Sequence, residues 1–310
     1  MARSHPLGPP VGQTPTTVAL GIRRRVLEHT LRHGGGYLSQ ALSSAEILSV
    51  LYTRVMRLGP SEGAPVPGPF AGVPGHAHGP YRTGSAYNGA HAPDLDRFYL
   101  SPAHYALVLY ACLIATGRMD EEGLRQFNLD GSTVEMIGAE HSPGMEVTTG
   151  SLGQGLSQAL GAALARKLKG ESGRTWVFLS DGELQEGQTW EAFAVARFHA
   201  LDRVAVYVDV NGQQCDGRMA DVLDIGDARQ KLEAFGAVAL EVDGHDTAAL
   251  EAAAATAHPG RPLVVLCRTR PYQGLDIVRA RAPRYHYVRF ASEAERRPYE
   301  EALAAMAGEG

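Results

Sequence analysis

The chain has 310 residues, of which 44% are hydrophobic and 20% are charged, and its formal net charge is −5. This composition is typical of a folded globular protein and excludes a disordered or fibrous one. The negative net charge gives no support for nucleic acid as a partner. Because the N-terminus lacks the apolar core of a signal peptide, no apolar run is long enough to span a membrane, and the three cysteines are isolated, we expect a cytoplasmic protein with no membrane contact.

The first part of the chain predicts a tail followed by helices. Residues 1–15 are rich in proline, glycine and threonine, which indicates a flexible N-terminal tail, and we expect residues 16–310 to form a single domain. Apolar spacing predicts a helix over residues 18–33. Ser43 and Glu46 have the spacing of a capping box, which predicts that a second helix starts there.

A segment over about residues 59–93 is dense in glycine, proline and histidine. Loops of this length are usually functional or disordered, so we interpret the segment as an insertion that forms a lid. Further helices are predicted over residues 102–116, 120–127 and 152–169, and a glycine-rich turn opens the last of them.

The second half of the chain alternates between short apolar runs and helical patterns. Strands are predicted over residues 176–179, 204–209, 238–242 and 263–267, and helices over residues 186–200, 227–235, 246–258 and 292–306. This alternation predicts an α/β fold in which a parallel sheet carries helices on both faces. Near-continuous apolar runs such as VAVYV agree with strands that are buried on both sides.

Two of the predicted strands end in oxygen-bearing side chains. The run WVFL leads to Asp181, and VAVYV leads to Asp209 and Asn211. Ligands bind at the carboxyl ends of the strands in open parallel sheets, so Asp181 and Asn211 converge if their strands are neighbours. Carboxylate and amide oxygens suit Mg²⁺ or Ca²⁺ and not zinc, and the other positions of a Mg²⁺ ion are commonly filled by water and phosphates. The sequence therefore predicts a metal-bridged phosphate or diphosphate at this edge of the sheet.

A glycine-rich turn supports this interpretation. Residues 148–155 read TTGSLGQG and open a predicted helix, whose free N–H groups favour anions. Gly182 leaves room for a ligand to approach the backbone. Taken singly, Asp181 and Asn211 are better explained as cap or turn residues, but together with the glycine-rich turn they favour a binding site.

The segments TTGSLGQG, DGELQEG at 181–187 and VNGQQCDG at 210–217 resemble the thiamine diphosphate domain of the transketolase family. The resemblance covers roughly residues 18–290 and implies the diphosphate-binding (PP) type of the thiamine diphosphate-binding fold. The family has a GDG motif followed by a later asparagine, and Ser180 replaces the first of these glycines here.

On this resemblance, Asp181, Asn211 and the backbone carbonyl of Gln213 are ligands of Mg²⁺. The residues implied to contact thiamine diphosphate are Gly150, Ser151, Leu152, Ser180, Asp181, Gly182, Glu183, Asn211 and Gln213. Glu186 matches a family glutamate of catalytic importance that links two cofactor sites across a dimer interface. An ordinary acidic residue in the first turn of a helix explains Glu186 nearly as well.

Histidines shape the substrate channel in this family. His104 in LSPAHYA and His286 in RYHYV match two of them and are the candidate acid/base or hydroxyl-binding groups. Two others are replaced: one falls on Tyr37, and the other falls near Ala139, where His141 is an open substitute. His245 in VDGHD also matches a family segment, but we expect a left-handed turn or a capping role for it.

Full-length family members carry further domains, one of which supplies a glutamate that activates the cofactor, and we expect that glutamate on another chain. The resemblance thus implies the N-terminal subunit of a two-component transketolase-like enzyme, an α2β2 assembly active only with a subunit that carries the pyrimidine-binding domain. It would transfer a two-carbon ketol or acetyl unit from a ketose or pyruvate to an aldehyde or ketone sugar. Two alternatives stay open: the α-subunit of a 2-oxo acid dehydrogenase, and a non-catalytic binding subunit.

Overall fold

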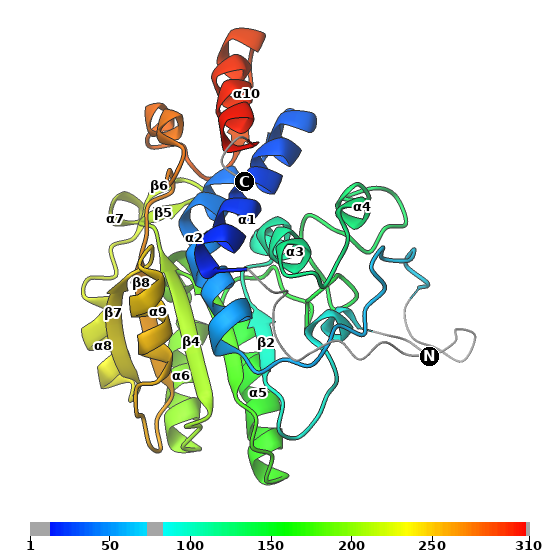
Figure 1. The fold of residues 1–310 in the computed structure, drawn as a ribbon. Helices are drawn as coiled ribbons and strands as arrows, with labels where there is room; N and C mark the ends of the chain where they lie inside the picture. Colours follow the sequence, from blue (N-terminus) through cyan, green and yellow to red (C-terminus); the bar gives the residue numbers. More distant parts are fainter. Residues whose placement is uncertain (1–12, 73–82, 308–310) are drawn as a thin grey trace, which may run out of the picture.

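The computed structural model describes residues 13–72 and 83–307. At its centre lies a five-stranded sheet of order β2-β3-β4-β8-β7, in which every neighbouring pair of strands is parallel (Figure 1). The strands are β2 (Arg97–Leu100), β3 (Thr175–Ser180), β4 (Val204–Val210), β7 (Val238–Asp243) and β8 (Leu263–Arg268). The predicted parallel sheet is therefore confirmed, and β8 returns between β4 and β7.

Helices cover both faces of this sheet. The first face carries α1 (Pro15–Arg32), α2 (Leu38–Val50), α3 (Ala106–Ala115) and α9 (Thr247–Ala254), and the second carries α5 (Gln154–Leu168), α6 (Gly187–Phe198) and α8 (Ala228–Ala234). Neighbouring residues of β3 show why the strands are apolar throughout, because Phe178 packs into the first layer and Leu179 into the second. The predicted α/β architecture with helices on both faces is confirmed.

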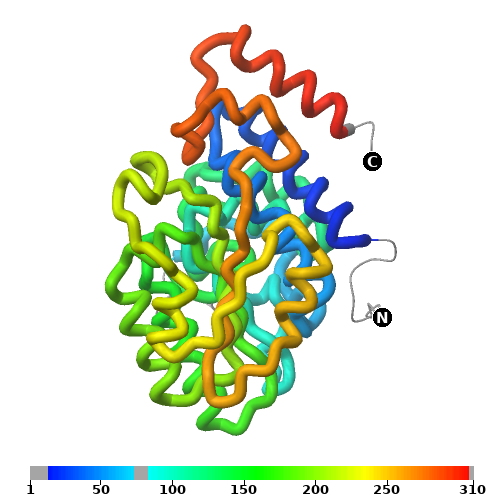
Figure 2. Tube along the Cα trace, turned by 90° about the vertical axis from the view of Figure 1, so that its left-hand side faces the viewer, coloured from blue at the N-terminus to red at the C-terminus, as the bar shows by residue number. Residues whose placement is uncertain are grey.

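The two ends of the described chain lie close together. Helix α10 (Glu293–Ala307) packs against α1 and lies at the top of the molecule in the view of Figure 2. Helix α1 already begins at Pro15, and residues 1–12 of the predicted tail lie outside the described residues. Within residues 13–72 and 83–307, we find no helix with the length and hydrophobicity needed to cross a bilayer.

The predicted start of the second helix is wrong. Helix α2 begins at Leu38, so Ser43 and Glu46 lie in its interior and do not form a capping box. Every residue of α2 is buried, and the polar side chains on its inner face bond to other elements instead of to the helix end. Strand β2 was not predicted, because a run as short as RFYL carries too little periodicity.

The described parts of the insertion, residues 59–72 and 83–93, pack against the loop that leads into the glycine-rich turn. Gly84 donates its N–H to the carbonyl of Glu140 at 2.6 Å and accepts from Gly144 at 2.8 Å. A Cβ on Gly84 would lie 1.6 Å from the carbonyl oxygen of Ser142, so no other residue fits there. Residues 73–82 lie outside the described residues, and the lid stays a prediction.

Candidate active site

The ends of β3 and β4 meet as the sequence predicts. The two strands are paired in register, with Ser180 opposite Asp209. Asp181 follows Ser180 at the start of a short 3₁₀ helix, η4 (Asp181–Gln185), and Asn211 starts the turn into the hairpin β5–β6 (Gln213–Gln214 and Gly217–Arg218). The turn closes onto Asp181 because the N–H of Gly212 donates to Oδ2 of that carboxyl at 2.7 Å.

The burial and hydrogen bonding of Asp181 suit a carboxyl group that binds a cation. It is 3% exposed, and its Oδ1 has no hydrogen-bond partner within the described part of the chain. Burial, and then the charge of Asp209, raise the pKa of Asp181 to about 8. A buried carboxylate oxygen without a partner is unfavourable, and a bound metal ion would remove that penalty. The residues present therefore fit the Mg²⁺ site that the sequence implies.

Asp209 is the group that orients Asn211. Its buried carboxylate accepts from Tyr105 at 2.8 Å and from Nδ2 of Asn211 at 3.1 Å, and also from the hydroxyls of Ser43 and Thr269. Since the amide nitrogen of Asn211 is bonded to Asp209, the amide oxygen of Asn211 points away from Asp209. The sequence placed Asp209 at the strand end but gave it no role. Its signal was an acid at the end of an otherwise apolar strand.

Glu183 supports the glycine-rich turn and does not reach the pocket. It is fully buried and accepts from the N–H groups of Gly153 at 3.1 Å and Ser180 at 3.0 Å, and from the hydroxyl of Ser101. Burial raises the pKa of Glu183 to about 6. The sequence predicts direct contact with the cofactor, but the structure places this side chain behind the turn.

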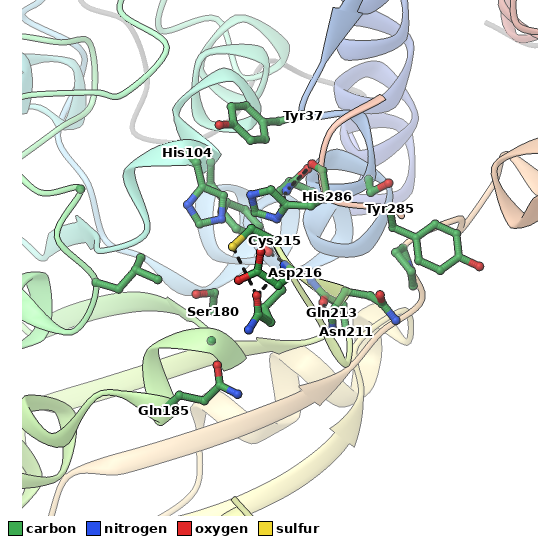
Figure 3. Close-up of a pocket in the computed structure, with 18 of the residues that line it drawn as sticks. Tyr37, His104, Ser180, Gln185, Asn211, Gln213, Cys215, Asp216, Tyr285 and His286 are labelled. Atoms are coloured by element: carbon green, nitrogen blue, oxygen red, sulfur yellow. Dashed lines mark hydrogen bonds between the residues drawn. The ribbon is translucent and has the colours of Figure 1, made fainter. Parts of the chain in front are cut away.

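A cavity of about 390 Å³ opens above these strand ends (Figure 3). Its lining includes these residues that the sequence analysis named: Tyr37, His104, Gly150, Leu152, Ser180, Gly182, Glu186, Asn211, Gln213 and His286. Ser151, between the lining residues Gly150 and Leu152, is exposed, and Asp181, between the lining residues Ser180 and Gly182, is buried. Further lining residues that the sequence did not single out are Ser39, Gln40, Tyr105, Ile137, Gln185, Gln214, Cys215, Asp216, Pro271 and Tyr285.

Unsatisfied oxygen atoms gather at this cavity. In the described residues, the buried side-chain oxygens without a hydrogen-bond partner include Oγ of Ser39, Oε1 of Gln40, Oε1 of Gln213 and Oδ1 of Asp181. Buried polar atoms normally have partners, so this grouping indicates a place where a polar ligand completes the structure. The cavity thus combines a candidate cation site with hydrogen-bonding groups that suit an organic ligand.

Three rings form one wall of the cavity. The ring centroids of His104 and His286 lie 5.1 Å apart, and the ring of Tyr37 lies 5.7 Å from His104 and 5.5 Å from His286 (Figure 3). The Nε2 of Gln40 donates to the carbonyl of His286 at 3.0 Å and so fixes its backbone. Burial lowers the pKa of His104 to about 3 and also lowers the pKa of His286. Both imidazoles are therefore neutral at neutral pH.

Tyr37 lines the cavity, whereas His141 does not. On the resemblance, Tyr37 replaces a family histidine. His141 lies away from the lining, 3.1 Å from Oε1 of Glu135 and with its ring centroid 4.3 Å from that of Phe70. The structure thus brings Tyr37 into the wall with the two histidines, whereas His141 stays in the loop behind it.

Comparison with known proteins gives the family. The family model described as the thiamine diphosphate binding domain of transketolase matches residues 64–275. The chain belongs to the transketolase family. A transketolase family protein of Sinorhizobium fredii is 37% identical, with 86% of this chain and 88% of that protein covered.

Two relatives of similar length are named as transketolase subunits. The 6-deoxy-6-sulfo-D-fructose transketolase subunit of a Clostridium species is 31% identical, and the match covers 80% of this chain and 82% of the relative. The apulose-4-phosphate transketolase subunit of Actinobacillus succinogenes is 30% identical, and the match covers 89% of this chain and 92% of the relative.

Solved transketolases share the fold. The transketolase of Leishmania mexicana superposes with a TM-score of 0.67 at 24% identity, covering 96% of this chain and 45% of that one. The Campylobacter jejuni transketolase has a TM-score of 0.67 at 21% identity, covering 95% of this chain and 47% of that one. The chain therefore spans less than half the length of these solved transketolases.

Proposed function

We propose that this chain is the N-terminal subunit of a two-component transketolase-like transferase that depends on thiamine diphosphate and Mg²⁺. The observation that carries the proposal is the position of Asp181, whose buried Oδ1 has no partner in the described chain and lies beside the turn of Asn211. When bound, thiamine diphosphate supplies a nucleophilic carbon that allows carbon–carbon bonds beside a carbonyl to be broken and formed.

The residues at the strand ends would hold this cofactor. Asp181, Asn211 and the carbonyl of Gln213 would bind the Mg²⁺, a set of hard oxygen ligands that suits this ion. The diphosphate and the middle of the cofactor would be contacted by Gly150, Ser151, Leu152, Ser180 and Gly182. Glu183 would act through the turn that it supports, because it is buried behind the cavity wall.

The histidines would orient the substrate. Since burial keeps His104 and His286 neutral, each can donate one hydrogen bond and accept another from a sugar hydroxyl or carbonyl. Tyr37 adds a hydroxyl near them. Glu186 lines the same cavity, and we assign it to the contact with a second subunit, which supports catalysis there.

The substrates are a ketose or pyruvate donor and an aldehyde or ketone sugar acceptor, between which a two-carbon unit is transferred. The names of two relatives support sugar substrates, because one refers to 6-deoxy-6-sulfo-D-fructose and the other to apulose-4-phosphate. The replacement of a family histidine by Tyr37 keeps both donor classes open. All three cysteines are free thiols, which agrees with a reducing compartment such as the cytoplasm.

A separate partner subunit is part of the proposal. Two of the relatives that match along most of their length are named as subunits, which supports a partner chain that carries the pyrimidine-binding domain. We propose an α2β2 assembly, with each active site formed between unlike subunits.

The test is reconstitution. The purified chain is titrated with thiamine diphosphate with and without Mg²⁺, and then assayed with its co-expressed partner for transfer from a ketose and from pyruvate. We expect Mg²⁺-dependent binding, and transfer only in the presence of the partner. Full activity of the chain alone contradicts the two-component layout, and absence of binding even with the partner contradicts the cofactor assignment. Reductive acetylation of lipoyl groups supports the dehydrogenase alternative.

A further inference from the structure

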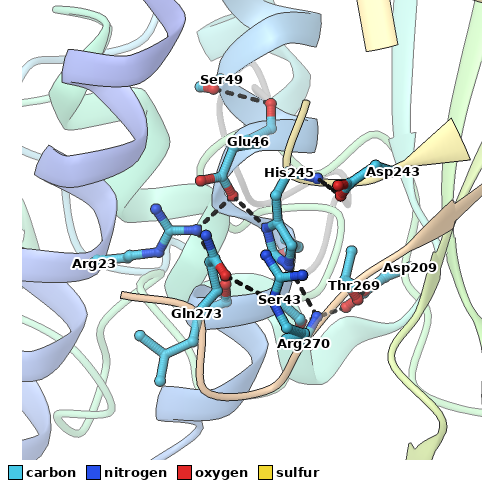
Figure 4. A network of polar contacts seen from close by, with 12 residues as sticks. Arg23, Ser43, Glu46, Ser49, Asp209, Asp243, His245, Thr269, Arg270 and Gln273 are labelled. Atoms are coloured by element: carbon cyan, nitrogen blue, oxygen red, sulfur yellow. Dashed lines mark hydrogen bonds and ion pairs between the residues drawn. The ribbon is translucent and has the colours of Figure 1, made fainter. Parts of the chain in front are cut away.

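A buried polar cluster lies next to the cavity but outside its lining. It consists of Arg23 on α1, Glu46 on α2 and His245 after β7 (Figure 4). Glu46 pairs with Arg23 and lies 3.1 Å from Nδ1 of His245. The side chains of Arg23, Glu46 and His245 are 9%, 10% and 4% exposed. Buried polar groups need good hydrogen-bond partners, and the partners in this cluster join three separate elements of the fold.

The second ring nitrogen of His245 connects the cluster to the segment after β8. Its Nε2 lies 2.9 Å from the backbone nitrogen of Arg270. A backbone N–H only donates, so Nε2 accepts, and the ring proton sits on Nδ1 and is donated to Glu46. His245 does not have the predicted left-handed conformation or capping role. It lies in a turn without a positive φ, Asp246 caps α9, and the imidazole bridges α2 to the segment after β8.

That segment, residues 269–271, connects the cluster to the metal site. The N–H of Thr269 donates to the carbonyl of Val210 at 3.1 Å, and its hydroxyl donates to the carboxylate of Asp209. A glycine is needed at position 244, because a Cβ there would lie 2.4 Å from Cγ2 of Thr269. Pro271, at the other end of the segment, lines the cavity.

Asp209 completes the connection, because it accepts from Nδ2 of Asn211 at 3.1 Å. Hydrogen bonds and the backbone of residues 269–270 thus join Glu46 to Asn211. Helix α2 supports this path at both ends. Ser43, which precedes Glu46 by one turn on the same face, donates directly to Asp209.

We propose that His245 is a positioning residue for the metal site. By accepting from Arg270, it fixes segment 269–271, and through Thr269 and Asp209 it fixes the amide of Asn211. This inference rests on the proposed function, under which Asn211 is a ligand of Mg²⁺. Residues that orient metal ligands commonly change metal affinity by about 10- to 100-fold when they are replaced.

The first experiment replaces the ring. His245→Phe keeps a ring of similar size and removes both nitrogens, so the Mg²⁺ concentration for half-maximal thiamine diphosphate binding should rise about 10-fold. His245→Gln restores an acceptor for Arg270 and should recover most of this loss. The matched control is His258→Phe, since His258 is also buried and lies 2.8 Å from the carbonyl of Arg261 at the opposite end of β8. The control should leave the Mg²⁺ dependence unchanged.

The second experiment tests the path. Thr269→Val removes the hydroxyl bond to Asp209, and its effect should not add to that of His245→Phe, because both changes interrupt one path. Amide hydrogen exchange at Arg270, measured without metal, should be faster in His245→Phe than in the wild type. If His245→Phe does not fold, Thr269→Val alone decides, since an unchanged Mg²⁺ dependence there overturns the proposal.

The outcomes separate the two proposals. A wild-type protein that binds no thiamine diphosphate with its partner and Mg²⁺ contradicts the proposed function, and with it the metal role of His245. A wild type that binds, together with a His245→Phe variant of unchanged Mg²⁺ dependence, overturns only the positioning role. Additive effects of His245→Phe and Thr269→Val overturn the path through Thr269.

Discussion

The N–H of Gly212 donates a hydrogen bond of 2.7 Å to Oδ2 of Asp181, and this contact joins the turn after β4 to the end of β3. Gly212 has a φ of +71°, a conformation that glycine adopts readily. The backbone N–H of Gly212 bonds to Oδ2 of Asp181, whereas Oδ1 of Asp181 has no partner among the described residues. One carboxyl group thus supports the turn with one oxygen and offers the other to a cation.

Asp181→Asn should abolish Mg²⁺-dependent thiamine diphosphate binding, because an amide oxygen is a much weaker ligand than a carboxylate. The same variant should stabilise the metal-free protein. The folded state holds the proton of Asp181 more tightly than the unfolded state, since its pKa is raised from 3.8 to about 8. The wild-type carboxyl therefore destabilises the metal-free fold increasingly as pH rises through that interval, and constantly above it.

Calorimetry at pH 8 measures both effects of Asp181→Asn, as cofactor binding and as the Tm without metal. Asp202→Asn is a control, because Asp202 is an exposed acid on the loop before β4, at the far end of the sheet. Undiminished cofactor binding by Asp181→Asn would show that the metal site lies elsewhere.

Glu183→Gln should lower the free energy of unfolding by about 1–3 kcal/mol. The NH2 group of the new amide cannot accept a hydrogen bond, whereas every partner of the Glu183 carboxylate is a donor. These groups are the N–H groups of Gly153 and Ser180 and the hydroxyl of Ser101. Urea unfolding measures the change. Glu191→Gln on the exposed side of α6 should change stability by less than about 0.5 kcal/mol. Equal effects of the two variants would contradict a supporting role for Glu183.

His104→Phe should lower kcat/KM of the reconstituted enzyme by about 100-fold and leave cofactor affinity unchanged, because the ring would contact the substrate and not the diphosphate. The pKa of His104 is about 3, so its charge does not change in the usual assay range. The acidic limb of the pH–rate profile should therefore be the same in the variant and the wild type. A shifted acidic limb would show that His104 titrates during catalysis.

Cys215 should be the cysteine that reacts first with iodoacetamide in the native protein. It is exposed at the cavity, whereas Cys112 and Cys267 are buried. Its pKa is raised by burial and by Asp216, so the reaction should be slow at neutral pH and faster as pH rises. Peptide mapping by mass spectrometry identifies the modified thiol. Bound thiamine diphosphate and Mg²⁺ should protect it, and lack of protection would place the cofactor outside this cavity.

His29→Phe should reduce the loss of stability in acid. His29 is buried on α1 against His33 and Phe127, and burial lowers its pKa from 6.5 to about 3. The unfolded state therefore binds a proton that the folded state does not, and stability falls as pH decreases below 6.5. Between pH 8 and pH 5 this group accounts for about 2 kcal/mol. Urea unfolding at both values should show a smaller difference in the variant, and an equal difference would refute this assignment.

Much of the fold and part of the site could be predicted from local patterns. Apolar runs such as VAVYV identify buried strands, and the alternation of strands and helices implies parallel pairing. Because the carboxyl ends of parallel strands share one edge, Asp181 and Asn211 could be placed together without coordinates. The motif around Asp181 and Gly182 also gave the family. The start of α2 was mispredicted because Ser43 and Glu46 imitate a helix cap.

The sequence by itself determined four of the five strands of the sheet, the edge that carries the site and the residue types that suit a metal-bridged diphosphate, since these follow from patterns along short segments. Only the tertiary structure decided which side chains support that site. The contact between Ser43 and Asp209 spans 166 positions, and that between Glu46 and His245 spans 199. No local pattern encodes such pairs, because they depend on how helices pack on a sheet. The hydroxyl bonds from Ser43 and Thr269 that hold Asp209 and the inward position of Tyr37 both arise in this way.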